Sequence, residues 1–209
     1  MKVFVVGADW DYANWLPNCK LVDSIKESDL VLFTGGEDVS PSLYKEPIGE
    51  RTRTNPYRDK VESRVFMQAV EENKPILGIC RGSQLCCVMS GGRLVQDQRN
   101  PSGIHDITTV EGDVIPMTST HHQAQYPYDM PENEYKLLAY TEDYCGHHYD
   151  GTNKEIANKP FKEVEICYYP KTRALGIQGH PEYVVGNKAF KDTFDYLDTL
   201  ISNLLTNTL

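Results

Sequence analysis

Cys80 has the neighbours expected of a catalytic nucleophile. Gly78 precedes it by two residues and Gly82 follows it by two, which is the cysteine version of the G-x-S-x-G nucleophile elbow. Residues 75–79 are apolar, too few for a helix and bounded by turn formers, which predicts a short buried strand. The sulfur would then stand at a helix N-terminus, where unpaired N–H groups and the dipole favour a thiolate and can bind an oxyanion. A lone cysteine at a strand end is more often a small buried hydrophobe, so the assignment needs a base elsewhere.

His180 and Glu182 supply a candidate base and a carboxylate to orient it. They lie on either side of Pro181, directly after residues 174–178, which are predicted to form another strand. In an extended segment, residues two apart point to the same side, and Pro181 disfavours a helix. An imidazole held by a carboxylate can activate a cysteine. A His-x-Glu pair alone is common, but together with the cysteine elbow it predicts a Cys-His-Glu triad.

Gly35 and Gly36 directly follow residues 29–33, which are predicted to form a buried strand. Two glycines at a strand end indicate unusual backbone angles or the close approach of a ligand. The alternative is a plain tight turn.

The first half of the chain alternates predicted strands and helices. The predicted helices are residues 57–73 and 81–90, and the predicted strands are residues 2–6, 18–22, 29–33 and 75–79. This alternation is typical of an α/β protein with a doubly wound, mostly parallel sheet flanked by helices. Ligands of such sheets bind beyond the carboxyl ends of the strands, which is where Gly35, Gly36 and Cys80 fall.

The second half is less regular. Five segments separated by turns rich in Pro, Gly, Asn and Asp could each be strands: residues 93–97, 106–110, 113–117, 136–141 and 163–169. They are expected to add a smaller antiparallel group. Residues 187–205 are predicted to form an amphipathic helix, because apolar residues recur every three or four positions. No repeat or linker interrupts the chain, so residues 1–209 are expected to form a single domain.

The composition is that of an ordinary globular protein. Of the 209 residues, 40% are hydrophobic and 24% charged, and the net charge is −9. The chain has no cluster of Lys and Arg, which argues against a nucleic-acid partner. No apolar run approaches the length of a membrane span, and the N-terminus resembles a first strand rather than a signal peptide. Six cysteines without disulfide-framework spacing predict free thiols and a cytoplasmic location.

Two other groups of residues have simpler interpretations. Cys145, His147 and His148 lie in one loop, but no partner pair stands at a zinc-site spacing, so no metal site is expected. Arg58-Asp59 with Glu62 are interpreted as a solvated helix start with i,i+4 charge support.

A set of motifs in a fixed order makes the chain similar to a known family. The motifs are residues 33–41 with Tyr44, Arg58-Asp59 with Glu62, residues 75–84, Gly91-Gly92 with Gln96-Asp97, Ser119 with His121-His122-Gln123, and residues 178–182. Over about residues 1–205, the chain resembles a class I glutamine amidotransferase domain of the Cys-His-Glu triad superfamily. Within that superfamily it is most similar to the γ-glutamyl hydrolase-like branch. The resemblance implies a flavodoxin-like fold.

The resemblance also implies a role for each matching residue. Cys80 matches the nucleophile, His180 the general base and acid, and Glu182 the residue that orients His180. The backbone N–H groups of Gly36 and Arg81 match the oxyanion hole. Five residues match the substrate pocket: Gly35, Gln84, His121, His122 and Gln123. The resemblance implies no metal and no other cofactor.

The implied activity is cleavage of the γ-amide of glutamine, or of a small γ-glutamyl compound, through a cysteinyl thioester. Glutamate and ammonia or an amine are the products. Two alternatives stay open: a glutaminase subunit that supplies ammonia to a separate synthetase or amidase chain, and a non-catalytic binding module on the same fold. One departure from the family is Gly179, which stands where an aromatic residue usually precedes His-Pro-Glu. The pocket is therefore expected to be wider or looser there.

Overall fold

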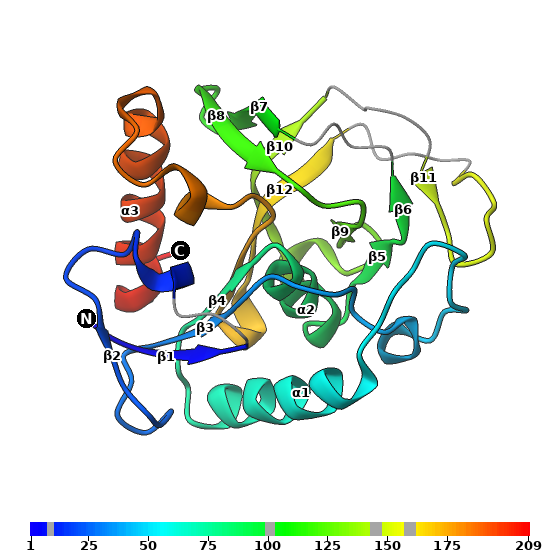
Figure 1. Cartoon of the computed structure of the whole chain (residues 1–209), viewed down its shortest axis with the longest axis horizontal. Helices are drawn as coiled ribbons and strands as arrows, with labels where there is room; N and C mark the ends of the chain where they lie inside the picture. The colour runs from blue at the N-terminus through cyan, green and yellow to red at the C-terminus, as the bar shows by residue number, and fades with distance from the viewer. Residues whose placement is uncertain (8–10, 99–102, 143–147, 157–161) are drawn as a thin grey trace.

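The computed structural model describes residues 1–7, 11–98, 103–142, 148–156 and 162–209 (Figure 1). Within these residues, nine strands form one mixed sheet in the order β2-β1-β3-β4-β13-β12-β10-β7-β8. Their bounds are β1 Lys2–Val6, β2 Lys20–Leu21, β3 Leu30–Phe33, β4 Ile76–Ile79, β7 Gly103–Thr109, β8 Val114–Ser119, β10 Lys136–Thr141, β12 Glu163–Tyr169 and β13 Ala174–Ile177.

The sheet has a parallel half and an antiparallel half. Strands β2, β1, β3, β4 and β13 are parallel to one another, whereas β12, β10, β7 and β8 continue the sheet with antiparallel pairs. The expected α/β fold with a mostly parallel core and an antiparallel strand group is therefore confirmed. Its antiparallel part is larger than predicted and belongs to the same sheet.

Two small antiparallel sheets complete the strands of the described residues. Strand β5 (Arg93–Val95) pairs with β9 (Ala124–Tyr126), and β6 (Asp97–Gln98) pairs with β11 (His148–Tyr149). The single strand predicted over residues 93–97 is thus two strands. The break falls at Gln96, where the pairing partner changes from β9 to β11. The Gln96 side chain accepts from the Gly49 N–H (2.9 Å) and donates to the Pro47 carbonyl (3.0 Å).

Helices cover both faces of the sheet (Figure 1). Helices α1 (Pro56–Glu71) and α2 (Arg81–Met89) lie on one face and α3 (Lys191–Thr206) on the other. In β3, Val31 and Phe33 pack toward α1 and α2, while Leu30 and Leu32 pack toward α3. A strand buried on both faces is apolar at every position, which is why this strand was visible in the sequence.

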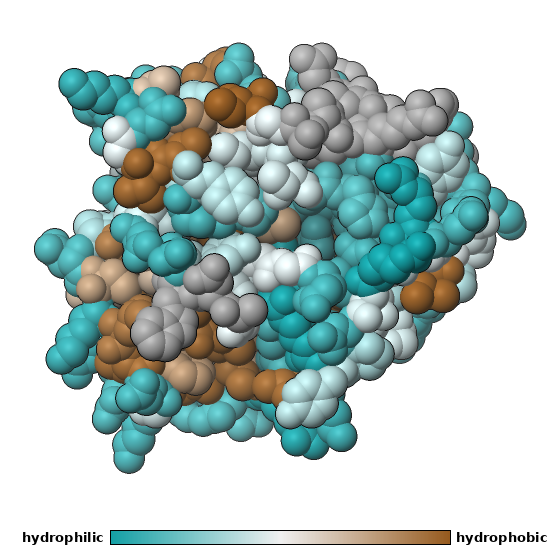
Figure 2. All heavy atoms as spheres, in the orientation of Figure 1, coloured by the Kyte–Doolittle hydropathy of each residue, from teal (hydrophilic) through white to brown (hydrophobic). Residues whose placement is uncertain are grey.

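Apolar and polar residues divide one face of the molecule. In Figure 2, most of the hydrophobic residues on this face gather on the left half, among hydrophilic ones, whereas the right half is mainly hydrophilic. Among the described residues, no helix is both long and apolar enough to cross a membrane.

The cysteines of the described residues are all free thiols, as predicted: Cys19, Cys80, Cys86, Cys87 and Cys167.

Candidate active site

Cys80 occupies a strained backbone conformation between β4 and α2. Its φ of 52° and ψ of −108° are rare for a residue with a side chain. Hydrogen bonds on both sides hold it there: the Cys80 N–H donates to the Ile177 carbonyl (2.8 Å), and the Cys80 carbonyl accepts from the Ser83 hydroxyl (2.6 Å). The sharp strand-to-helix turn predicted from the glycine spacing is therefore present.

Glycines on both sides of Cys80 let the backbones pack against each other. A Cβ on Gly78 would lie 2.2 Å from the Gly82 carbonyl oxygen, and a Cβ on Gly82 would lie 2.2 Å from the Phe33 carbonyl oxygen. Any side chain at either position would push α2 off the sheet. The spacing that identified the elbow thus has a packing reason, as expected.

His180 lies at the end of the neighbouring strand and pairs with Glu182. Strands β4 and β13 are parallel, with Ile79 in register with Ile177, so Cys80 and His180 both follow this edge of the sheet. The Nδ1 of His180 lies 2.6 Å from the Glu182 Oε1. The extended segment predicted here is wrong, because Pro181 opens a 3-10 helix, Pro181–Val184. Proline suits a first helical position, where its fixed φ fits and no N–H is needed, and the short helix turns Glu182 back to the imidazole.

The second ring nitrogen of His180 is free for chemistry. Its Nε2 is buried and has no hydrogen-bond partner in the described part of the chain. Burial lowers the pKa of His180, but its interactions with Cys80 and Glu182 outweigh that effect and raise the pKa to about 9. An imidazole with this environment carries a proton at neutral pH beside the sulfur.

Thr118, in β8, fixes the backbone of His180. Its hydroxyl donates to the His180 carbonyl (2.8 Å) and accepts from the His180 N–H (2.9 Å). The same strand fills the space beside Gly179, where a Cβ would lie 2.3 Å from the Met117 Cγ. Met117 thus occupies the space beside Gly179, and the wider pocket expected there stays a prediction.

Thr118→Val should lower activity more than its cost in stability explains. Valine keeps the shape but leaves the buried His180 N–H unpaired, which costs about 1–3 kcal/mol. The His180 carbonyl keeps only its bond from the Tyr183 N–H (3.2 Å), so the backbone that carries the imidazole is held less firmly. We expect kcat to fall about tenfold, measured beside thermal unfolding.

Thr193→Val is the matched control for this prediction. Thr193 is also buried, and its hydroxyl donates to a carbonyl of the same strand, that of Pro116 (2.7 Å). This variant should lose stability without losing activity per folded molecule. An equal effect of the two variants on kcat would contradict the role of Thr118.

Two tyrosines beside His180 were not found from the sequence. The Tyr183 ring stacks on the imidazole with centroids 4.4 Å apart, and the Tyr12 ring lies 6.0 Å away at a tilt of 51°. Burial, then the Glu182 charge, raises the pKa of Tyr12, so its hydroxyl keeps its proton. Tyr183 follows Glu182 directly and could have been suspected. Tyr12 lies far away in the chain and carries no motif.

The Gly35–Gly36 turn lies against His180. A Cβ on Gly35 would lie 2.5 Å from the Tyr12 hydroxyl and 3.2 Å from the His180 Cε1. Gly36 has a φ of +141°, which residues with side chains rarely adopt. Of the two interpretations of the glycine pair, the structure supports unusual backbone angles and close approach over a plain tight turn.

The predicted pocket residues fall into two groups. Gln84 Nε2 and His121 Nδ1 both donate to the Gln123 carbonyl, each at 2.9 Å, so these three residues form one buried cluster. Burial lowers the pKa of His121 to about 3, which keeps this imidazole neutral. His122 instead pairs with Asp38, with its Nε2 3.1 Å from the carboxylate.

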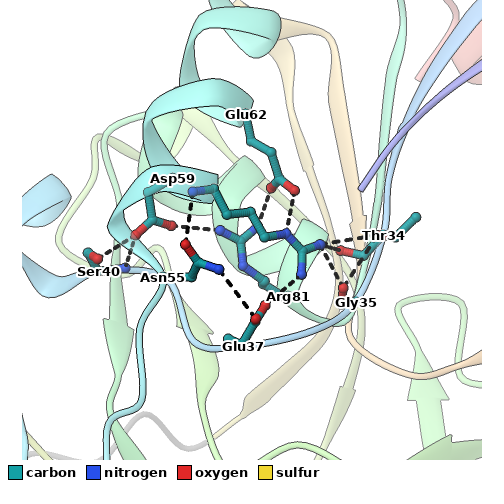
Figure 3. Close-up of polar contacts among 9 residues, drawn as sticks. Thr34, Gly35, Glu37, Ser40, Asn55, Asp59, Glu62 and Arg81 are labelled. Carbon is teal, nitrogen blue, oxygen red and sulfur yellow. Dashed lines mark hydrogen bonds and ion pairs between the residues drawn. The ribbon is translucent and has the colours of Figure 1, made fainter. Parts of the chain in front are cut away.

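A buried ion network lies behind the elbow (Figure 3). Arg81, only 1% exposed, donates to Asp59 (2.6 Å) and to Glu62, and Arg58 donates to Glu62 (2.6 Å). The predicted i,i+4 pair is confirmed, but the predicted solvated surface is wrong, because Asp59 and Glu62 are 3% and 2% exposed. The start of α1 packs on the start of α2, and buried charges there must be paired.

Only part of the possible metal loop lies within the described residues. Cys145 and His147 lie outside the described residues, and His148 pairs with Glu163 (3.2 Å). In the part of the chain that the structure covers, no three His, Cys, Asp or Glu side chains are placed to hold a metal ion.

Comparison with known proteins agrees with this architecture. The chain is 37% identical over 160 residues to the glutamine amidotransferase-like protein YvdE of Lactococcus lactis. The matched stretch covers 74% of this chain and 66% of YvdE. It is 33% identical over 124 residues to γ-glutamyl peptidase 4 of Arabidopsis thaliana, and this matched stretch covers 53% of this chain and 41% of that protein. The chain thus spans less than two thirds of the length of these curated relatives.

Solved structures show the same fold. The chain superposes on a protein of Thermoplasma acidophilum named as one subunit of a GMP synthase, with a TM-score of 0.62, 16% identity, and coverage of 99% of this chain and 94% of that one. The family model for peptidase C26 matches residues 17–182, a stretch that contains both Cys80 and the His180–Glu182 pair. The chain belongs to the peptidase C26 family, within the class I glutamine amidotransferase-like fold.

Proposed function

We propose that this protein hydrolyses the γ-amide of glutamine or of a small γ-glutamyl compound through a thioester on Cys80. One observation carries the proposal. A strained cysteine and a buried His180–Glu182 pair, 2.6 Å between Nδ1 and Oε1, stand at the ends of two neighbouring parallel strands. The names of the relatives, a glutamine amidotransferase-like protein and a γ-glutamyl peptidase, support the same bond type.

The reaction follows from the chemistry of these side chains. The Cys80 sulfur attacks the γ-carbonyl carbon, and the backbone N–H groups of Gly36 and Arg81 donate to the oxyanion that forms. His180 passes its proton to the departing nitrogen, so the C–N bond breaks and a glutamyl thioester remains. His180 then takes a proton from water, which attacks the thioester and releases glutamate and the Cys80 sulfur.

The glutamyl end is assigned to Gly35, Gln84, His121, His122 and Gln123. Two observations support a polar pocket beside the elbow. The Gln123 Oε1 is buried without a hydrogen-bond partner among the described residues, so it can accept from an ammonium group. Gln84 lies on the first turns of α2, four residues after Cys80, and holds the Gln123 carbonyl.

A second candidate function is a glutaminase subunit that feeds ammonia to a separate synthetase chain. The Thermoplasma protein supports it, because it is named as part of a synthase and is nearly matched in extent by this chain. No metal or other cofactor is needed for either reaction, since thiolate, imidazolium and backbone N–H groups supply each step.

Ammonia, amine and glutamate release would separate these functions. The purified chain is offered glutamine and a panel of γ-glutamyl amines, with Cys80→Ala as the blank. Fast release from a panel member identifies a self-sufficient hydrolase. Slow release throughout, with Cys80 still labelled by a glutamine-like chloroketone, identifies a subunit that needs its partner. Neither release nor labelling would contradict the proposal and leave a non-catalytic binding module.

A further inference from the structure

The guanidinium of Arg58 lies directly beneath the Gly35–Gly36 turn. Its NH2 donates to the Gly35 carbonyl (2.8 Å) and to the Thr34 hydroxyl (3.1 Å), and its NH1 pairs with Glu37 (2.9 Å). Thr34, Gly35 and Glu37, which are labelled in Figure 3, are therefore all tied to one side chain of α1.

The bond to the Gly35 carbonyl also determines where the Gly36 N–H points. These two groups belong to the same peptide, and the described residues contain no cis peptide bond. In a planar trans peptide the C=O and N–H point in opposite directions. A carbonyl drawn toward Arg58 therefore directs the Gly36 N–H away from the ion network. A cation on the carbonyl oxygen also polarises the peptide and strengthens its N–H as a donor.

We propose that Arg58 is a positioning residue that holds the Gly35–Gly36 peptide in the orientation needed to stabilise the oxyanion. The inference rests on the function proposed above. Arg58 does not touch the reacting atoms, and it acts through the Gly36 N–H. The sequence places Arg58 in a charged helix start and in one of the family motifs, with no link to the glycine turn.

Glu62 connects Arg58 to Arg81, whose backbone N–H is the second proposed oxyanion donor. Its Oε1 accepts from the Arg58 Nε (2.6 Å), and its Oε2 accepts from the Arg81 guanidinium. Asp59 extends the connection, because it accepts from Arg81 (2.6 Å) and from the Ser40 N–H (3.3 Å) beyond the turn. Gly35, through its backbone carbonyl, and Arg81, through its side chain, are thus both tied to α1.

Gly36 and Gly7 leave the space that the Arg58 guanidinium occupies. A Cβ on Gly36 would lie 2.0 Å from the Arg58 NH1, and a Cβ on Gly7 would lie 3.0 Å from the NH2. Only glycine at position 36 leaves room for the guanidinium against the peptide. A side chain at position 36 would therefore have to displace the guanidinium from the peptide.

Crystal structures of the wild type and of Arg58→Ala test the inference directly. Without the guanidinium, the Gly35–Gly36 peptide should rotate or become disordered, while Glu62 still holds Arg81. A peptide that keeps its orientation in Arg58→Ala would overturn the inference, whether or not the wild type turns over any amide.

Kinetics give a second, independent readout. Losing one oxyanion donor costs about 10²–10³ in kcat, so Arg58→Lys and Arg58→Ala should lose about that factor with KM nearly unchanged, because the donor acts in the transition state. Added guanidinium ion should restore part of kcat in Arg58→Ala. A KM effect alone, or no rescue, would contradict the role.

Arg173→Lys is the matched control. The Arg173 guanidinium also donates to backbone carbonyls, those of Asn73 (2.6 Å) and Leu204 (3.3 Å), at a junction that carries none of the candidate site residues. This variant should lose stability and keep kcat. Turnover by the wild type is scored separately: its absence would contradict the proposed function, and the crystallographic comparison would still decide the role of Arg58.

Discussion

Cys80→Ala is expected to abolish amide hydrolysis, with a loss of about 10⁴-fold or more, because no other group can form the thioester. The fold should persist. The side chain is buried to 8% exposure and loses only its sulfur, and the hydrogen bonds that hold residue 80 come from its backbone. Glutamate release and thermal unfolding of the same preparation are the two measurements.

Cys19→Ala provides the control for the cysteine prediction. Cys19 is a free, half-buried thiol that is not among the candidate site residues, and burial raises its pKa. This variant should retain full activity and should still be labelled at Cys80 by a chloroketone. Retained hydrolysis by Cys80→Ala would sink the assignment of the nucleophile.

Glu182→Gln is expected to lower kcat about 10²- to 10⁴-fold and to shift the pH profile. In the wild type, burial disfavours the imidazolium form of His180, but the contacts with Cys80 and Glu182 favour it more strongly. Together they raise the pKa of His180 to about 9. Protonation of the leaving nitrogen needs that proton, so activity should fall as pH rises through about 9. Removing the Glu182 charge lowers the pKa, and the alkaline limb should move down by about one pH unit.

The His180–Glu182 pair also makes a pH-dependent contribution to the stability of the fold. The folded pKa of His180, about 9, is above the ordinary value of about 6.5. The contribution is therefore fully present below about pH 6.5 and is lost as pH rises through about 9. The difference in thermal stability between the wild type and Glu182→Gln should shrink over that interval. A difference that grows with pH would contradict the raised pKa.

Glu163→Gln is the control for Glu182→Gln, because it also removes a carboxylate from a buried histidine. The His148 Nε2 lies 3.2 Å from Glu163. His148 is in β11, which pairs with β6, and Glu163 is the first residue of β12, so neither residue is at the elbow. This variant should leave the pH profile of kcat unchanged. An equal shift in both variants would mean that the limb reports general electrostatics rather than His180.

The parallel core could be predicted from the sequence because its signals are local. Strands buried on both faces, such as Leu30–Phe33 and Ile76–Ile79, are apolar at every position. The turn at Cys80 was visible for a similar reason, since its glycines are required by contacts within a few residues and with one neighbouring strand. The roles of Cys80, His180 and Glu182 in catalysis stay predictions.

Other features depend on contacts that no local pattern encodes. Asp59 and Glu62 look like surface charges until Arg81, about twenty residues later, is packed on them. Tyr12 meets His180 only because the sheet brings the two together. The turn at Pro181 was mistaken for an extended segment because proline excludes a helix interior but not its first position.

The position of β13 between β4 and β12 has a consequence for how the protein acquires its site. The elbow at Cys80 is anchored to the Ile177 carbonyl, nearly a hundred residues later in the chain. Closing so long a loop is entropically costly, and pairings of this kind form late in folding. Until β13 is inserted, the strained conformation of Cys80 lacks the hydrogen bond to its N–H and is held only by the local bonds to its carbonyl. A newly made chain should carry an inert thiol through most of folding and gain its reactive one only in the last step.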